Sequence, residues 1–166
     1  MNGLTGSLRT ARPVRLALAA RLGGDIDGSW WPYSNSVAQE LPGLIGCLHD
    51  TLGEIIDVCI NWPVTEGPLE LETMVIGTRR PTPKSRRLRL MFIEGQKGSA
   101  KLLVIPHMTS AELGTLVMRY AAGRPVLEYE PEDRMVQTAE LILRTAQVES
   151  ANWAARMRQV ATTAEP

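Results

Sequence analysis

Hydrophobic and polar residues alternate along several parts of the chain with the two-residue period of a β-strand. Between residues 13 and 22, Leu16, Leu18 and Leu22 fall on one face, and arginines and alanines fall on the other. Side chains of a strand point alternately to its two faces, so this pattern predicts a first strand with one solvated face. Four further strand-like runs follow, at residues 54–62, 69–78, 86–94 and 100–106.

The links between these four runs are short. Residues 63–68 contain Pro and Gly, residues 79–85 contain two Pro, and residues 95–98 form a Gly-bounded turn. Short links favour antiparallel neighbours, because a parallel neighbour needs a crossover of about a dozen residues or more. Residues 102–105 are all apolar, which predicts a central strand covered on both faces.

Between the first strand and the central strands, apolar residues recur at helical spacing. The predicted helix begins after Ser36, which stands in capping-box position with Gln39, and ends at Gly53. Pro42 lies inside this helix. It is expected to kink or split the helix, because proline removes a backbone donor and clashes with the preceding turn.

Two more helices are predicted towards the C-terminus. Thr109 and Glu112 form a capping box for the first, which closes at Gly123, and the second runs from about residue 132 to residue 160. A narrow apolar seam follows the last helix at steps of three and four residues, and it either packs on the sheet or pairs with a second copy of itself. The candidate dimer-interface residues on this seam are Met135, Ala139, Ile142, Ala146 and Trp153.

Together these elements predict an α+β fold. We expect an antiparallel β-meander of about five strands with helices packed on one face, plus a long C-terminal helix. The expected organisation is a flexible N-terminus (1–12), the α+β domain (13–123), a linker (124–131), the C-terminal helix (132–160) and a flexible tail (161–166).

The overall charge of the 166-residue chain is balanced, with 18 Lys plus Arg and 18 Asp plus Glu. A net charge of zero provides no general attraction to nucleic acid or anionic lipid, so such binding requires a local patch. No run approaches the roughly 20 apolar residues that cross a bilayer, so no membrane partner is expected. Two cysteines without a secretory signal predict reduced thiols and a cytoplasmic protein.

Aromatic residues concentrate at Trp30, Trp31 and Tyr33, next to the carboxylates Asp25 and Asp27. Adjacent residues of an extended chain point to opposite sides, so the two tryptophans cannot enter one core layer. Two interpretations remain open. The segment is either a structural anchor between the first strand and the following helix, or the aromatic wall of a ligand groove with the two aspartates as polar partners.

Residues 27–34 also fit the pattern DGxWWPxS. An ELPxL helix follows at residues 40–44, then an Asn-Trp pair at residues 61–62, an apolar strand at residues 102–106 and a helix from Ser110. This order of motifs resembles an uncharacterised actinobacterial family that is known only as a domain of unknown function. The resemblance covers about residues 14–122 and implies domain limits, but no activity and no catalytic residues. The helix after residue 131 lies outside it, so any function particular to this chain is sought partly there.

A basic cluster stands near the middle of the chain. Placed on a hairpin, such a cluster can grip phosphates, or it can be a solvated tip whose charge protects a sheet edge. The candidate nucleic-acid-binding residues are Arg79, Arg80, Lys84, Arg86, Arg87 and Arg89.

Residue types that carry catalysis are scattered. His49 and His107 are isolated, and Cys47 and Cys59 are too far apart for a C-x-x-C motif, so no catalytic residue, metal or cofactor is predicted. The sequence favours a non-enzymatic binding or regulatory module, dimeric and with an unidentified protein partner. The alternatives are nucleic-acid or ribosome binding through residues 79–89, and small-molecule binding at a Trp-lined groove.

Overall fold

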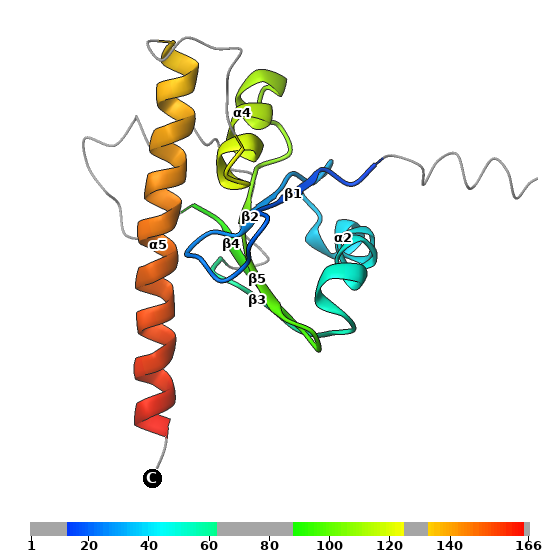
Figure 1. Cartoon of the computed structure of the whole chain (residues 1–166), viewed down its shortest axis with the longest axis vertical. Coiled ribbons are helices and arrows are strands. Elements are labelled where there is room, and N and C mark those ends of the chain that lie inside the picture. The colour runs from blue at the N-terminus through cyan, green and yellow to red at the C-terminus, as the bar shows by residue number, and fades with distance from the viewer. Residues whose placement is uncertain (1–12, 63–87, 125–132, 165–166) are drawn as a thin grey trace, which may run out of the picture.

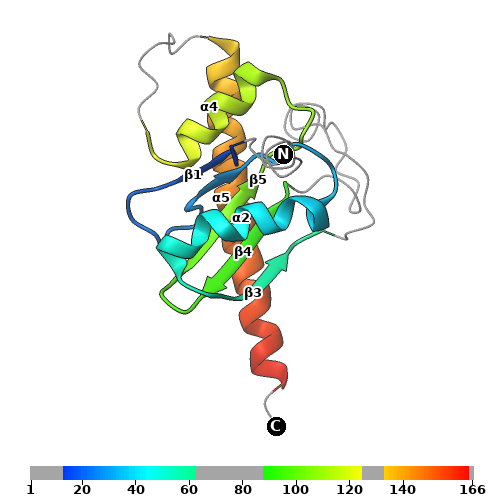
Figure 2. The ribbon, with the colours of Figure 1, turned by 90° about the vertical axis from the view of Figure 1, so that its right-hand side faces the viewer.

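A five-stranded sheet lies between one helix on one side and two helices on the other (Figures 1 and 2). The computed structural model describes the backbone of residues 13–62, 88–124 and 133–164, and the side chains of the same residues up to 160. In chain order the elements are β1 (Leu16–Leu18), β2 (Gly28–Trp30), α2 (Val37–Leu52), β3 (Ile55–Ile60), β4 (Leu90–Gly95), β5 (Ser99–Val104), α4 (Ala111–Ala121) and α5 (Arg134–Ala164). No helix within these described residues is long and apolar enough to cross a membrane.

The strand order is β1-β2-β5-β4-β3, and the sheet is mixed. The pairs β1–β2, β4–β5 and β3–β4 are antiparallel, whereas β2 runs parallel to β5. The α+β class is therefore confirmed, and the antiparallel meander is wrong. The reason is β2, a strand of three residues that the turn signal Asp27-Gly28 conceals, and that reaches β5 only after α2, β3 and β4 have intervened.

Both faces of the sheet carry helices, so the prediction of helices on one face is also wrong. On one face Leu44, Leu48 and Leu52 of α2 pack on the sheet in a shared core. On the other face α4 and α5 cover a second core that includes Leu103 of β5. The apolar run of β5 supplies alternate side chains to the two cores, as the prediction of a doubly covered central strand requires.

Trp30 and Trp31 separate to opposite sides of the sheet, as their adjacency predicts. Trp30 belongs to the core under α2 and is 2% exposed. Trp31 belongs to the core under α4 and α5 and is 5% exposed. The motif therefore ties the N-terminal strands to both hydrophobic cores at once.

The long C-terminal helix is part of this second core. Ala139, Ile142 and Ala146 are 0% exposed in their own chain, and Met135 and Trp153 pack at the edge of the same cluster. The sequence left two alternatives for the apolar seam, packing on the sheet or pairing with a second copy of the helix. In the structure the seam packs within its own chain, against the sheet and α4. A dimer would therefore have to form through other residues of this helix.

Helix ends differ from the predictions by one to four residues. Ser110, not Thr109, caps α4 by accepting a hydrogen bond from the Leu113 amide at 3.3 Å. The start of α5 is set by Asp133, whose carboxylate accepts the Met135 amide at 2.8 Å. The helix continues to Ala164, beyond the predicted end at residue 160, through a stretch containing alanine, the best helix former.

The first helix agrees closely with its prediction. Ser36 caps α2 by accepting the Gln39 amide, and Gly53 follows its last residue. Pro42 lies within one continuous helix, so the expected split is not present. The strand predicted at residues 69–78 and the segment 1–12 lie outside the described residues.

Close approach of α4 to Trp31 makes one glycine necessary. A Cβ atom at Gly114 would overlap the six-membered ring of Trp31. We expect Gly114→Ala to lower the free energy of unfolding by about 1–3 kcal/mol, because well-packed cores tolerate added volume poorly. Urea denaturation followed by circular dichroism measures the change.

Gly46 of α2 provides the matched control, because it also lies inside a helix and a Cβ there would meet nothing within 4 Å. Gly46→Ala should raise the stability by about 0.5–1 kcal/mol through the lower backbone entropy of alanine. A gain of similar size for Gly114→Ala would show that the Trp31 contact imposes no constraint.

Candidate ligand-binding cleft

Asp27, a candidate ligand residue, is instead 2% exposed and hydrogen-bonded to the backbone. Its Oδ1 accepts the amides of Gly23 and Gly24 at 2.8 and 3.0 Å, and its Oδ2 accepts the Lys101 amide at 2.9 Å. The Asp27 amide in turn donates to the Lys101 carbonyl at 2.8 Å. The carboxylate thus closes the turn before β2 and joins it to β5, while the other candidate, Asp25, is exposed.

The remaining aromatic candidates pack around Arg15. Its guanidinium carbon lies 3.8 Å from the Trp31 ring centroid and 4.1 Å from that of Tyr33. The same guanidinium donates to the carbonyls of Trp31 and Pro32 at 2.9 and 2.8 Å. These contacts, together with the burial of Trp30, favour the anchor interpretation of the motif over the groove interpretation.

The basic cluster lies mostly outside the described residues, which do not include residues 79–87. Arg89 is described and is 5% exposed, with its guanidinium carbon 5.3 Å from the Trp62 ring centroid. A phosphate contact requires an accessible guanidinium, so Arg89 is a packing residue in this structure.

A cleft of about 320 Å³ lies between α5 and the sheet. Its sheet wall is a row of neighbouring residues on three adjacent strands, since Cys59 of β3 pairs with Phe92 of β4, which pairs with Lys101 of β5. The lining residues are Asp57, Cys59, Phe92, Lys101, Ser150, Trp153, Ala154, Met157 and Arg158.

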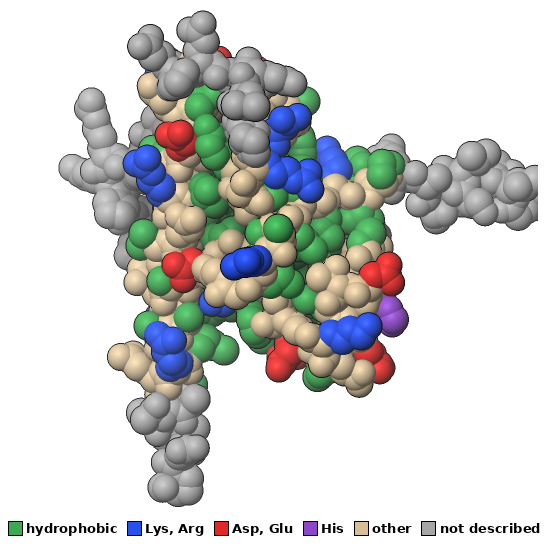
Figure 3. All heavy atoms as spheres, in the orientation of Figure 1, with side chains coloured by type: hydrophobic (Ala, Val, Ile, Leu, Met, Phe, Trp, Pro, Cys, Tyr) green, Lys and Arg blue, Asp and Glu red, His purple; other side chains and the backbone are tan. Residues whose placement is uncertain are grey.

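The helix wall of the cleft is one face of α5. Its lining residues recur at steps of three, one, three and one, which places them on adjacent turns of a single helical face. Hydrophobic side chains gather along the junction of α5 with the rest of the molecule on the face shown in Figure 3, and the C-terminal end of the helix projects past the sheet (Figure 1). Met157 is 52% exposed on this helix, which leaves apolar surface open to a ligand.

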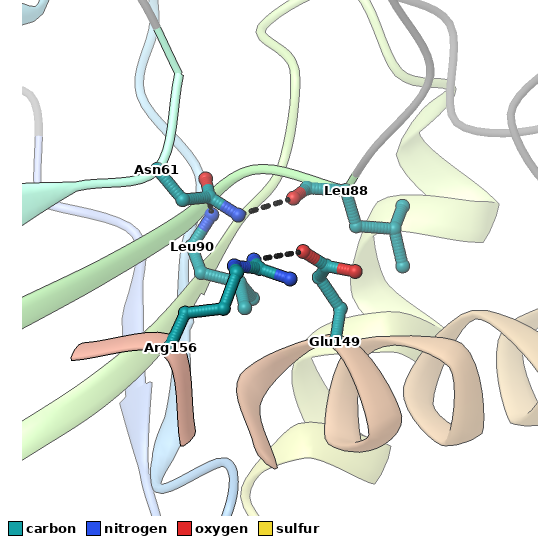
Figure 4. A network of polar contacts seen from close by, with 5 residues as sticks. All are labelled: Asn61, Leu88, Leu90, Glu149 and Arg156. Atoms are coloured by element: carbon teal, nitrogen blue, oxygen red, sulfur yellow. Dashed lines mark hydrogen bonds and ion pairs between the residues drawn. The ribbon is translucent and has the colours of Figure 1, made fainter. Parts of the chain in front are cut away.

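Three polar contacts stabilise the elements that frame the cleft (Figure 4). At the end of β3, the Asn61 side chain donates to the Leu88 carbonyl at 3.0 Å and accepts the Leu90 amide at 2.7 Å. On α5, Arg156 and Glu149 form an ion pair at 3.1 Å. Asn61 therefore stabilises the edge of the sheet, and the ion pair of Arg156 with Glu149 stabilises the half of α5 that lines the cleft.

The β3 end of the cleft differs in charge from the rest of its lining. The Cys59 thiol donates to Asp57 Oδ2 at 3.4 Å. Burial, followed by this hydrogen bond and the negative charges of Asp57 and Glu94, raises the pKa of Cys59. The β3 end is thus acidic and holds a protonated thiol, whereas Lys101 and Arg158 provide positive charge elsewhere in the cleft.

Sequence reasoning had missed this cleft. The sequence predicts Trp153 as a dimer-interface residue and Cys59 as a reduced thiol, and neither prediction locates the cleft. The available signal was the helical spacing of Trp153, Met157 and Arg158, which adds a charged residue to the apolar face at the C-terminal end of the seam. Within the described residues, no three His, Cys, Asp or Glu side chains group to hold a metal ion.

The buried carboxylate can be tested by removing one of its oxygens. Asp27→Asn should lower the free energy of unfolding by about 1–3 kcal/mol, because an amide cannot accept at both positions and leaves a backbone donor unsatisfied. The exposed Asp25→Asn should change it by less than about 0.5 kcal/mol. Equal effects of the two substitutions in urea denaturation would contradict the structural role of Asp27.

The thiol in the cleft predicts a pH profile. In a Cys47→Ser background, the alkylation rate of Cys59 should rise at a higher pH than for an ordinary thiol, because only the thiolate reacts and the pKa is raised. Asp57→Asn should shift the midpoint of the pH–rate profile downwards, since it removes a negative charge and an acceptor. The distant Glu112→Gln should leave the profile unchanged. An unchanged profile for Asp57→Asn would show that Asp57 does not contribute to the raised pKa of Cys59.

Comparison with known proteins places the sheet wall of the cleft in a recognised family. The model of the family described as "Family of unknown function (DUF5994)" matches residues 15–121, which include β1 to α4, whereas α5 lies beyond the match. Searches of curated proteins and of solved structures found no match. Because the matched residues make up more than half of the 166-residue chain, the protein belongs to this family of unknown function.

Proposed function

We propose that this protein is a non-enzymatic binding module that holds a small molecule in the cleft between α5 and the sheet. The observation that supports this function best is the cleft itself, with a volume of about 320 Å³ and walls that are apolar except for a few polar groups. Small-molecule sites in proteins are concave, mostly apolar and typically about 300–1,000 Å³ in volume.

The lining favours binding over catalysis. A nucleophilic cysteine needs a lowered pKa, produced by a nearby cation or a helix N-terminus. Cys59 has the opposite environment, because burial and the carboxylates of Asp57 and Glu94 raise its pKa. A binding function does not require Cys59 to lose its proton, so it fits this environment better than nucleophilic catalysis does.

Burial of apolar surface would provide most of the binding free energy. Phe92, Trp153 and Met157 line the cleft and are not fully buried, so a ligand between them removes apolar area from water. Each 100 Å² removed contributes about 2.5 kcal/mol before the entropy of association is subtracted. Affinities in the micromolar range are expected for a ligand that fills such a cleft.

The sequence offered, as one alternative, a ligand groove lined by Trp30 and Trp31. The cleft proposed here is also lined by a tryptophan, but by Trp153. The nucleic-acid alternative depends on residues 79–87, which lie outside the described residues, and Arg89 is buried. A dimer through the seam of α5 would compete with the packing of Ala139, Ile142 and Ala146 in their own chain. The cleft is consequently the surface on which the proposal rests.

The proposal is tested by filling the cleft. The neutral dye N-phenyl-1-naphthylamine, whose fluorescence rises in apolar surroundings, should bind the unmodified protein saturably with one site per chain. Ala154→Phe places a ring in the cleft and should weaken binding at least about tenfold, which corresponds to about 1.4 kcal/mol. Fluorescence titration measures the dissociation constants.

Ala155→Phe is the matched control, because Ala155 neighbours Ala154 on α5 but is exposed and does not line the cleft. It should bind the dye like the unmodified protein. If Ala154→Phe also binds normally while its circular dichroism spectrum is unchanged, the cleft is not a binding site. Small molecules that mass spectrometry finds with the protein from native cells should likewise be retained by Ala155→Phe and lost from Ala154→Phe.

A further inference from the structure

Negative and positive side chains lie on different parts of the sheet wall of the cleft. On the sheet wall, Asp57 of β3 is paired with Glu94 of β4, so two carboxylates occupy one row near the sheet edge. Lys101 stands on β5, in the middle of the sheet, one strand beyond Phe92. Strands are about 4.8 Å apart, so Asp57 on β3 lies about two strand spacings from Lys101 on β5, with Phe92 of β4 between the two strands. Glu94 lies on β4, two residues along the strand from Phe92.

Lys101 is held in place by contacts that do not involve its ammonium group. Its backbone amide and carbonyl both bond to the buried Asp27, at 2.9 and 2.8 Å. The side chain is half-buried and lines the cleft. None of the ion pairs among the described residues includes Lys101, so an anion in the cleft would give its ammonium group a partner of opposite charge.

The nature of that anion follows from the donors on the two walls. Helix N-termini and loops of free backbone amides, which recognise phosphate, are not part of this lining. The helix wall comes from the interior of α5, where the amides bond within the helix, and the amide of Lys101 donates to Asp27. The donors that line the cleft are therefore side chains, with Lys101 as the cation on the sheet wall, which suits a compact group of single charge.

The balance of lining charges agrees with a single negative charge. The lining contains two cations, Lys101 and Arg158, and one anion, Asp57. Because Arg158 already interacts with another group, Lys101 is the cation with which a single carboxylate would pair. A second anionic group on the ligand would have to approach Asp57 and Glu94. These carboxylates lie on paired residues of β3 and β4, so a second negative charge on the ligand would be repelled at that end.

Given the binding function proposed above, we infer that the ligand is a small amphipathic monocarboxylate. Its carboxylate pairs with the ammonium group of Lys101, and its aromatic or aliphatic body lies between Phe92 on the sheet and Trp153 on α5. The acidic end of the cleft repels ligands with a second negative charge. This inference assigns Lys101 as the residue that selects the charge of the ligand.

The test compares two ligands that differ only in charge. 4-Phenylbutanoate and 4-phenylbutanamide share the same apolar body, and each is titrated as a competitor of N-phenyl-1-naphthylamine. In the unmodified protein the carboxylate should displace the dye at about tenfold lower concentration than the amide. Lys101→Met retains the apolar part of the side chain and should remove this preference while leaving the affinity for the neutral dye unchanged.

Lys97→Met is the control, because Lys97 is exposed in the turn after β4 and does not line the cleft. It should keep the full preference for the carboxylate. Lys101→Gln provides a second neutral variant if Lys101→Met does not fold, as judged by circular dichroism. 3-Phenylpropyl phosphate, a dianion near pH 8, should displace the dye less well than 4-phenylbutanoate at that pH.

The possible results separate the inference from the function on which it rests. Dye binding that Ala154→Phe does not weaken overturns the binding function. If the dye binds in the cleft but the acid and the amide compete equally, the binding function stands and the monocarboxylate is wrong. A preference that survives Lys101→Met and disappears in Arg158→Met overturns the assignment to Lys101.

Discussion

The pairing of β2 with β5 depends on one buried side chain. Asp27 accepts hydrogen bonds from two amides of its own turn and from the Lys101 amide, and its own amide donates to the Lys101 carbonyl. A buried carboxylate is tolerated only when such partners replace water. From this junction the parallel register follows, since Gly28 comes to stand opposite Leu102 and Trp30 opposite Val104. The same contact determines the backbone position of Lys101, on which the charge of the cleft depends.

The two faces of the sheet have different relations to the family. The core under α2 is built entirely from residues 14–104, all but the first of which lie within the family match. The core on the opposite face combines Leu103 and Ile105 of the matched part with Val136, Ala139 and Ile142 of α5, which follows it. The cleft lies on this second face, so the matched part supplies one wall and α5 supplies the other. Specificity for a ligand would therefore be shared between the family domain and a helix beyond its limits.

Local patterns predicted the elements whose signals are contained within them. Helix α2 follows from Ser36, Gly53 and the leucines between them, and β5 follows from its unbroken apolar run. That run also contained the evidence for helices on both faces, because a strand buried on two sides needs two covering layers. The parallel position of β2 had no local signal. It depends on hydrogen bonds between Asp27 and Lys101, and the turn-like Asp-Gly pair concealed so short a strand.

The cleft was harder to predict than the fold. Cys59, Phe92 and Lys101 become neighbours only through the register of three strands, and the predicted antiparallel meander specified no register. Trp153 was correctly assigned to the buried side of α5, but the sequence does not reveal that the sheet beneath it presents polar residues there. The rows of a sheet bring together side chains that are distant in sequence, so their chemistry emerges only with the topology.

The bond between Asp27 and Lys101 joins residues 74 positions apart, and this distance has a consequence for how the chain folds. Contacts between remote residues are slow to form, because the entropy of closing a long loop is lost before the contact is gained. The hairpins of β4 with β5 and of β1 with β2 are both local, whereas the pairing of β2 with β5 has to wait until β5 is synthesised. Both tryptophan cores include residues of β4 and β5. We therefore expect the burial of Trp30 and Trp31 to be completed late in folding.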